Sequence, residues 1–370
     1  MSIRVASRHN WDIDGLIKEI EQPQVKAVIY FFSLELERFE PHKAIKRAFP
    51  SAACIGASMC GGWCTTGASE KGIIAMSLSS DEVEETFIAL QEGVKSDPLL
   101  AAQQIIADLK RQIGYRTIFP NTYLGLVFFD GLCHGEVLIK RFTFEKGFNL
   151  NLVGGAAADE FAFEKTLVSA NEKCSADGVV LMVMKMKIPF FCNHYVHCLP
   201  TTTSFMITKA DPINRIIWEI DGQNAAEYYA KIVGVSGMDK LTASHLGKNP
   251  LGIVLGDTIY VRAVDKVIDG PALKINCSLE EGTKATLLRC GDIIGQAYTA
   301  LEEVKRQYLT AIQGALLFNC ALRYLELQEL NQVAEFNRVF QNIAFAGFNT
   351  FGEEYFTHHN QTLTAVFFGG

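Results

Sequence analysis

The chain has 370 residues, of which 49% are hydrophobic and 20% charged, and its formal net charge is −7. This balance is typical of a globular protein with two domains or one large one, since domains usually contain roughly 100–200 residues. An acidic chain without a basic cluster is a poor candidate for nucleic-acid binding, so no nucleic-acid partner is expected.

The N-terminal segment, MSIRVASRHNWDIDG, contains no apolar stretch of the kind found in secretory signals. The longest candidate membrane run, Val179 to Met184, is far shorter than the ~20 residues needed to span a bilayer. We therefore expect a cytoplasmic protein with no membrane partner. The ten cysteines, without a secretory signal, are expected to be reduced thiols.

A unit of strand, helix, strand, glycine turn and strand is predicted three times along the chain. Each copy starts with a short continuous apolar run, as expected of a strand covered on both faces. Each then passes through a helical segment to a glycine, which is followed five and six positions later by a small or acidic pair. The glycines are Gly56, Gly154 and Gly347, and the pairs are Gly61-Gly62, Asp159-Glu160 and Gly352-Glu353.

These glycines allow two interpretations. A glycine at the end of a buried strand permits a tight turn or a close approach of two backbones, which is a structural role. Alternatively, the three turns come together around one pocket. The repetition of the turn raises the second possibility, and the sequence alone leaves both open.

Helical segments connect the copies. Asp97 and Pro98 are typical of the cap and first residue of a helix, and an amphipathic stretch follows them. The sequence thus predicts an α/β fold of two related halves, built from repeated strand-helix-strand-turn-strand units on mixed sheets. The boundary is expected near residues 187–200, which gives domains 1–190 and 191–370.

The motifs follow one another in an order similar to that of a known family. They are CIGASMCGG, FFDGLCHGE, LVGGAAADE, HYVHCLP, WEIDGQNAAEYY, FNCALRY and AGFNTFGEEYF. With them the chain resembles the FIST family of sensory proteins, with an N-terminal and a C-terminal FIST domain in tandem. It departs from the family pattern at Gly61-Gly62, where Gly-Glu is usual, and at Cys198-Leu199, where Gly-Trp is usual.

The resemblance implies an intracellular signal-transduction protein that binds a small ligand and reports to a signalling partner. A stand-alone chain of this size is similar to the NosP-like nitric-oxide-sensing heme proteins. That subgroup implies heme as cofactor, nitric oxide as signal, a histidine kinase as partner, and leaves a homo-oligomer possible. The alternatives are a sensor of amino acids or other small ligands without heme, and a protein-binding scaffold without any ligand.

Four histidines are candidates to bind a heme iron. The stretch FFCNHYVHCLP contains Cys192, His194, His197 and Cys198. If it is a strand, the side chains on one face span ~13 Å, too far for one zinc ion with bonds near 2.0–2.3 Å. A heme needs a single imidazole, and the family resemblance includes His197, with His194 on the opposite face. His358 and His359 are rival ligands, and all four can equally be histidines with no ligand.

Polar residues of the third copy are further candidates for binding. Arg323, Asn349, Thr350 and Glu353 could contact an anionic ligand or heme propionates, because the planar guanidinium suits carboxylates. A structural Arg323–Glu353 pair is the alternative. No phosphate-binding loop or dinucleotide fingerprint is present, and this favours a protein that is not an enzyme.

Overall fold

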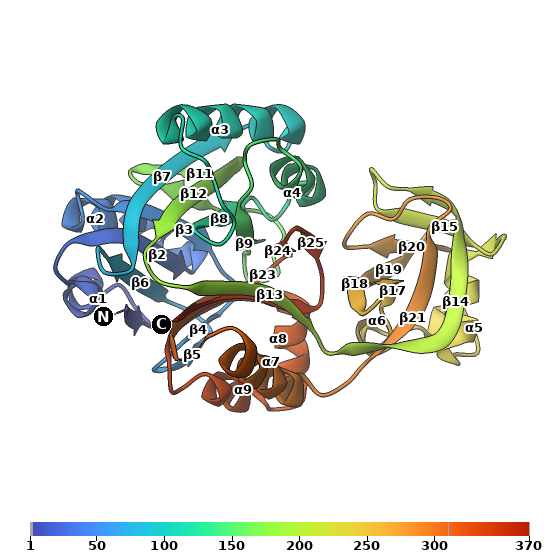
Figure 1. Cartoon of the computed structure of the whole chain (residues 1–370). Helices are drawn as coiled ribbons and strands as arrows, with labels where there is room; N and C mark the ends of the chain where they lie inside the picture. The colour runs from blue at the N-terminus through green and yellow to red at the C-terminus, as the bar shows by residue number, and fades with distance from the viewer. Residues whose placement is uncertain (1–2, 310, 370) are drawn as a thin grey trace. The chain divides into compact units, whose positions relative to one another are not determined.

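A computed structural model describes residues 3–309 and 311–369 and divides them into two compact units. Unit 1 contains residues 1–194, 297–358 and 363–370, and unit 2 contains residues 195–296 and 359–362. Helices and strands alternate along unit 1, whereas unit 2 consists mainly of strands (Figure 1). The mixed α/β fold predicted from the sequence is confirmed. No helix in the described part of the chain is long and apolar enough to cross a membrane.

Three six-stranded sheets of unit 1 share one strand order. Sheet A runs β1-β6-β2-β3-β10-β11, sheet C runs β7-β12-β8-β9-β24-β25, and sheet B runs β13-β26-β22-β23-β4-β5. Sheet A contains β1 (Arg4–Arg8), β2 (Val25–Phe32), β3 (Ala53–Ser58), β6 (Ile73–Ser79), β10 (Val168–Ala170) and β11 (Lys173–Ser175). Sheet C contains β7 (Val83–Glu92), β8 (Tyr123–Phe129), β9 (Asn151–Ala156), β12 (Gly178–Met186), β24 (Glu353–Tyr355) and β25 (Thr357–His359). Sheet B contains β4 (Gly62–Cys64), β5 (Gly67–Ser69), β13 (Phe190–Val196), β22 (Ile312–Cys320), β23 (Ala344–Thr350) and β26 (Thr362–Gly369).

Each sheet takes four of its six strands from one module of the chain. A module has the order strand, helix, strand, helix, strand, hairpin, strand. In every module the second and third strands pair in parallel, and the last strand pairs antiparallel to the second. The helices are α1 (Ile13–Ile20), α2 (Pro41–Ala48), α3 (Pro98–Ile113), α4 (Gly135–Thr143), α7 (Ile293–Gln307), α8 (Ala321–Glu329) and α9 (Val333–Val339), with a 3-10 turn at Leu34–Phe39. Asp97 caps α3 as expected, since its side chain accepts a hydrogen bond from the Leu100 amide at 2.9 Å.

The hairpin of each module joins the sheet of another module. Hairpin β4–β5 of the first module pairs with β23 in sheet B. Hairpin β10–β11 of the second module pairs with β3 in sheet A, and β24 of the third module pairs with β9 in sheet C. The three modules therefore exchange hairpins in a closed cycle, so that each sheet is completed by a segment distant in sequence.

Equivalent phenylalanines fill the centre of unit 1. Phe31, Phe128 and Phe318 occupy matching positions on β2, β8 and β22, and their ring centroids lie 5.6, 5.8 and 6.4 Å apart. Phe348 contacts all three rings. Because side chains alternate along a strand, the neighbouring residues point outward and pack under the helices. The centre of unit 1, to which all three modules contribute a phenylalanine, is therefore a packed hydrophobic core.

The repeated glycines lie inside strands β3, β9 and β23. A Cβ added to Gly154 would lie 1.9 Å from the Val127 carbonyl oxygen, and one added to Gly347 would lie 2.3 Å from the Leu317 carbonyl oxygen. A side chain at either position would collide with the parallel neighbouring strand. The close approach of two backbones thus explains Gly154 and Gly347, whereas an added Cβ at Gly56 would collide with the Tyr30 ring.

Unit 2 is inserted in the third module, between β13 and α7. Its sheet has the order β18-β17-β21-β14-β15-β20-β19, with β16 paired to β15. The strands are β14 (Cys198–Asp211), β15 (Ile216–Ile220), β16 (Gln223–Asn224), β17 (Leu251–Leu255), β18 (Thr258–Arg262), β19 (Val264–Ile268), β20 (Ala272–Ile275) and β21 (Lys284–Cys290). Its helices are α5 (Ala225–Val233) and α6 (Ala243–Lys248), with a 3-10 turn at Met238–Lys240. The domains 1–190 and 191–370 stay a prediction. Strand β13, the first of the third module, begins at Phe190, and the chain returns to unit 1 at residue 297.

Candidate functional site

The turns that follow β3, β9 and β23 meet in unit 1. Cys60 of the first turn and Ala158 of the second form a small buried cluster with Ala321 at the start of α8. Phe161 of the second turn and Phe351 of the third pack against it, with ring centroids 6.1 Å apart. The three turns are therefore brought together. The contacts are made by residues of the turns, and not by the repeated glycines, which lie inside the strands.

A small cavity, here called the turn cavity, lies beside this cluster and has a volume of about 220 Å³. All three modules contribute to its lining. The lining residues are Cys60, Glu70, Lys71, Glu160, Phe161, Tyr324, Leu325 and Gln328. Lys71 Nζ lies 3.4 Å from Glu160 Oε2 and 3.3 Å from Glu35 Oε2, and the hydrogen bond with Glu35 is the main cause of its raised pKa. The cavity therefore combines one ammonium group, carboxylates and aromatic rings.

A buried polar network supports the wall of the turn cavity. The Asn349 side chain donates to the Cys60 carbonyl at 3.0 Å, and its oxygen accepts from Trp63 Nε1 at 2.7 Å. Asn319 Nδ2 donates to the same oxygen at 3.0 Å, and Arg323 Nε donates to Asn319 Oδ1 at 3.0 Å. Because Tyr324 follows Arg323 on α8, this network fixes both the Cys60 turn and the Tyr324 ring.

Arg323 carries a charge inside this network. The residue is fully buried, and desolvation lowers its pKa to about 10, although the negative charge of Glu353 opposes this effect. Thr350 Oγ1 donates to Glu353 Oε1 at 2.7 Å. The structure thus brings together the four polar residues that the sequence singled out in the third copy, Arg323, Asn349, Thr350 and Glu353. They lie behind the cavity wall and are not themselves in its lining.

The thiols near the first turn are not prepared for nucleophilic chemistry. Burial raises the pKa of Cys60 far above its ordinary range and that of Cys54 to about 12. A thiol in this state is protonated at neutral pH and is a poor nucleophile. Their interpretation as small buried residues fits these surroundings.

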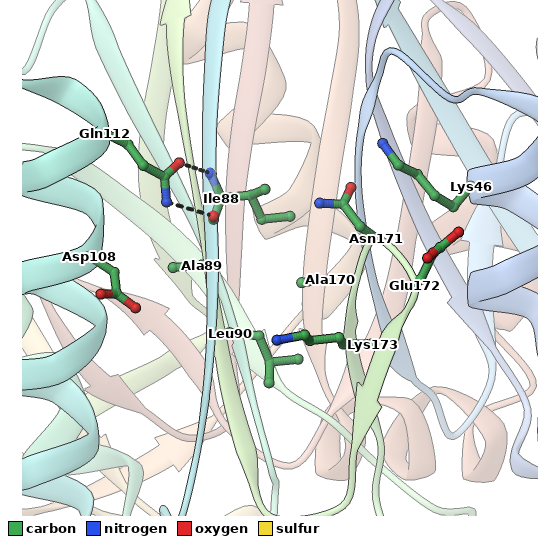
Figure 2. Close-up of a pocket in the computed structure, with 10 residues that line it drawn as sticks. All are labelled: Lys46, Ile88, Ala89, Leu90, Asp108, Gln112, Ala170, Asn171, Glu172 and Lys173. Carbon is green, nitrogen blue, oxygen red and sulfur yellow. Dashed lines mark hydrogen bonds between the residues drawn. The ribbon is translucent and has the colours of Figure 1, made fainter.

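A larger cavity of about 420 Å³ lies between strand β7 and the β10–β11 hairpin (Figure 2). We call it the edge cavity. Two of its polar side chains bind the backbone. Gln112 exchanges hydrogen bonds with the Ile88 backbone at 3.0 and 3.3 Å. Lys46 donates to the carbonyls of Pro50 and Ala52. These contacts protect the edge of a sheet, so the edge cavity is the weaker candidate for a ligand site.

Two of the candidate histidines belong to unit 1. His358 Nδ1 lies 2.6 Å from Glu354 Oε1, and both side chains are buried. An alanine at Gly352 would place its Cβ 2.1 Å from His358 Cε1, so the ring is held tightly. His194 is half-buried, with its ring 5.7 Å from that of Tyr355. His194 and His358 therefore have separate surroundings.

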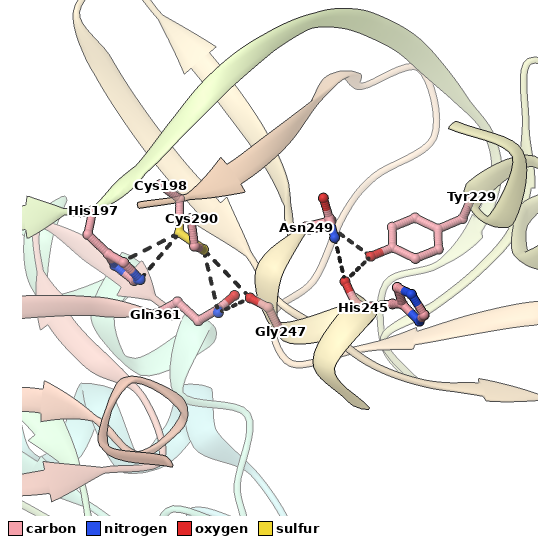
Figure 3. Close-up of a disulfide and its surroundings, with 8 residues drawn as sticks. All are labelled: His197, Cys198, Tyr229, His245, Gly247, Asn249, Cys290 and Gln361. Carbon is pink, nitrogen blue, oxygen red and sulfur yellow. Dashed lines mark hydrogen bonds between the residues drawn. A yellow bond between two sulfur atoms is a disulfide. The ribbon is translucent and has the colours of Figure 1, made fainter. Parts of the chain in front are cut away.

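The other two candidate histidines belong to unit 2. His359 is buried, and its ring is stacked on that of Tyr260 at 5.7 Å. His197 lies beside a disulfide between Cys198 and Cys290, with its ring nitrogens 3.8 and 3.9 Å from Cys198 Sγ (Figure 3). The prediction that all cysteines are reduced is wrong for this pair, because the register of β14 and β21 places the two residues opposite each other.

The surroundings of His197 do not fit a heme. The imidazole is only 4% exposed, and Cys198 Sγ lies 3.8 and 3.9 Å from its two ring nitrogens, so a porphyrin beside this ring would have to displace the disulfide. The turn cavity and the edge cavity contain none of the four histidines in their linings.

Sequence reasoning did not single out Lys71, Glu70 and Tyr324 of the turn cavity. Lys71 and Glu70 lie in the short connection between β5 and β6, where charged residues are normally solvated. The signal that could have identified them is their position: they follow the hairpin of the first glycine turn, and the three turns were suspected to converge.

The fold and the site together define a mixed α/β protein of three exchanged modules, whose turns meet at a small charged cavity. The FIST N domain matches residues 26–223, and the FIST C domain matches residues 225–355. The chain belongs to the FIST family. These domains are associated with sensory signal transduction and small-ligand binding.

Comparison with curated proteins gives no match. Among solved structures, one of a chorismatase is similar over 100% of both chains, at 9% sequence identity and a TM-score of 0.37. A likeness of this degree carries no argument about reaction or ligand.

Proposed function

We propose that this protein is a sensor that binds a small zwitterionic ligand, with a free amino acid as the best candidate, in the turn cavity. The observation that carries the proposal is the lining of this cavity: Lys71 can pair with a carboxylate, and Glu70 or Glu160 can pair with an ammonium group. Phe161, Tyr324 and Leu325 supply apolar contact for a side chain. The volume of about 220 Å³ is below the ~300–1,000 Å³ of sites for drug-sized ligands, so a small molecule suits it.

The same cavity offers a route for a signal. Because its walls come from three modules, a ligand that bridges them changes the free energy of their contacts. The Arg323–Asn319–Asn349 network ties α8 to the first turn, so closure around a ligand moves elements that belong to different sheets. A histidine kinase as the recipient of the signal, and a cytoplasmic location, are parts of the proposal that rest on the family resemblance.

Thermal shift measurements against a panel of amino acids test the proposal. At least one member is expected to raise the melting temperature, since a ligand at 100 times its Kd stabilises the folded state by about 2.7 kcal/mol. Lys71→Ala and Glu160→Gln should each weaken binding about tenfold or more, because each removes one charged partner worth ~1.4 kcal/mol. Lys173→Ala, in the edge cavity, is the matched control and should bind normally.

No stabilisation by any amino acid would contradict this proposal. So would a ligand whose affinity is unchanged in Lys71→Ala and Glu160→Gln. If Lys173→Ala alone weakened binding, the edge cavity would be the site.

The version of the proposal with heme and nitric oxide makes a separate prediction. Because Cys198 Sγ lies close to both ring nitrogens of His197, we expect that hemin titration produces no Soret band that depends on this residue. The measurement compares the wild-type protein with His197→Ala, and His194→Ala serves as the control on the same segment. A Soret band that His197→Ala abolishes and His194→Ala retains would establish the heme version instead.

A further inference from the structure

The disulfide of unit 2 and its neighbours form a cluster that the proposed function does not use. Cys198, on β14, is buried, whereas Cys290, the last residue of β21, is partly exposed. His197 precedes Cys198 and is only 4% exposed. The nitrogen and sulfur atoms of these three residues lie within 4.8 Å of one another.

We propose that reduction of the Cys198–Cys290 disulfide converts this cluster into a metal site that binds a soft divalent cation such as Zn²⁺. The site is closed while the disulfide is present, because both sulfur atoms are then bonded to each other. Once reduced, the two cysteines and His197 supply two thiolates and one imidazole, a ligand set that zinc prefers. The cluster is thus a switch between a covalent and a metal-bound state, and it does not depend on the turn cavity.

The distances suit zinc. Bonds of about 2.0–2.3 Å place neighbouring ligand atoms roughly 3–4 Å apart around a tetrahedral ion. The ring nitrogens of His197 are already 3.8 and 3.9 Å from Cys198 Sγ. Two residues of this set are neighbours in sequence and the third comes from the paired strand, so no single strand has to bend around the ion. The sequence argument against zinc concerned Cys192, His194 and Cys198 on one face of a single strand. Only Cys198 of these belongs to the present cluster, whose other members are His197 and Cys290.

A second observation points to an ion. Gln361 is 1% exposed, and its Nε2 donates to the Gly247 carbonyl at 2.7 Å and lies 3.9 Å from Cys290 Sγ (Figure 3). Its carbonyl oxygen, Oε1, is buried and accepts no hydrogen bond from the residues that the structure describes. Burying a polar oxygen without a hydrogen-bond partner costs free energy. We therefore expect Oε1 to gain a partner when the disulfide is reduced. Oε1 or a water molecule would complete the four ligands.

The backbone also holds Gln361 in place. Its φ is +48°, a left-handed conformation that residues other than glycine rarely adopt. The strain in this position is compensated by its surroundings, and such positions cluster at ligand sites and switches.

Reduction of the disulfide requires a source of two electrons, such as a dithiol. A dithiol protein of the thioredoxin type attacks the partly exposed Cys290 sulfur, forms a mixed disulfide and releases the Cys198 thiolate. The second thiol of the reductant then releases Cys290, so the reductant is oxidised to a disulfide and unit 2 gains two electrons and two protons. Zinc binding displaces the two thiol protons and forms two Zn–S bonds.

Thiol counting and zinc titration of the full chain test this switch. The untreated protein should show eight reactive thiols under denaturing conditions and ten after reduction with a trialkylphosphine, which takes up oxygen from water. The reduced chain should bind one zinc ion at least about 100-fold more tightly than the oxidised chain, since only thiolates ligate. Cobalt in place of zinc should give a thiolate-to-cobalt charge-transfer band.

The variants distinguish this site from other zinc binding. His197→Ala and Cys198→Ser, measured in the reduced state, should each weaken binding at least about tenfold, in line with the loss of a ligand. Cys174→Ser, a partly buried free cysteine of unit 1, is the control and should bind zinc like the wild type. Circular dichroism verifies that each variant is folded.

Three outcomes would overturn the proposal. Ten reactive thiols in the untreated chain would mean that no disulfide forms. Equal zinc affinity before and after reduction would mean that the disulfide does not control binding. Zinc binding that persists in both His197→Ala and Cys198→Ser would place the ion elsewhere. None of these outcomes touches the amino-acid proposal, which is tested in unit 1.

Discussion

Gly154→Ala is expected to destabilise unit 1 by about 3 kcal/mol or more, the upper end of the cost of overpacking. The added Cβ would lie 1.9 Å from the Val127 carbonyl oxygen. That oxygen belongs to the backbone of β8, which pairs in parallel with β9 through six residues of register, so it cannot move without breaking the sheet. Urea unfolding followed by circular dichroism measures the change.

Gly247→Ala is the matched control for this experiment. Gly247 lies in α6, and a Cβ there would meet no atom within 4 Å. Alanine is favoured over glycine inside helices by roughly 0.5–1 kcal/mol, so this variant should be unchanged or slightly more stable. A Gly154→Ala protein whose stability is within ~0.5 kcal/mol of the wild type would show that β8 and β9 are not as closely packed as described.

Arg323→Ala is expected to cost about 3–5 kcal/mol, the loss typical of breaking a buried charge pair. The substitution removes the hydrogen bond to Asn319 and leaves Glu353 buried without the positive charge that acts on it. It also leaves a cavity, since Arg323 is among the largest fully buried side chains. Chemical unfolding gives the free energy, and the amino-acid panel should show weaker binding because the wall of the turn cavity loosens.

A double variant separates charge from volume. Arg323→Met with Glu353→Gln keeps most of the buried volume and removes both charges, so it should recover a large part of the stability, as found when buried ion pairs are replaced together. Arg111→Ala is the control: that arginine is 78% exposed and pairs with Asp108 on the surface of α3, so its loss should change stability by less than ~1 kcal/mol. An Arg323→Ala protein no less stable than Arg111→Ala would refute a buried charge at this position.

Local patterns predicted the elements of the fold well. The apolar runs became β2, β8 and β22, the Asp97–Pro98 signal became the start of α3, and the three copies of the unit became three modules with one strand order. These features depend on periodicity and capping, which are visible within a dozen residues.

Features that depend on distant pairing could not be predicted in this way. Nothing near Gly62 shows that β4 will pair with β23, and nothing near Cys198 shows that it will face Cys290, 92 positions later. The same applies to Lys71, which lines the turn cavity only because the second turn and α8 lie beside it. The sequence identified the polar residues of the third copy as candidates. Long-range packing determines that Arg323 lies behind the wall of the turn cavity and not in its lining.

The cyclic exchange of hairpins has a consequence for synthesis of the chain. Residues 62–64 leave the ribosome long before the strand that they pair with, residues 344–350, has been translated. The first module therefore cannot finish folding until residues 344–350 have been made, and its hairpin edge stays open to unwanted pairing until then, a situation that promotes aggregation. Chaperone binding to the nascent chain would be most valuable over this interval, and premature termination between residues 290 and 344 would leave sheets B and C incomplete.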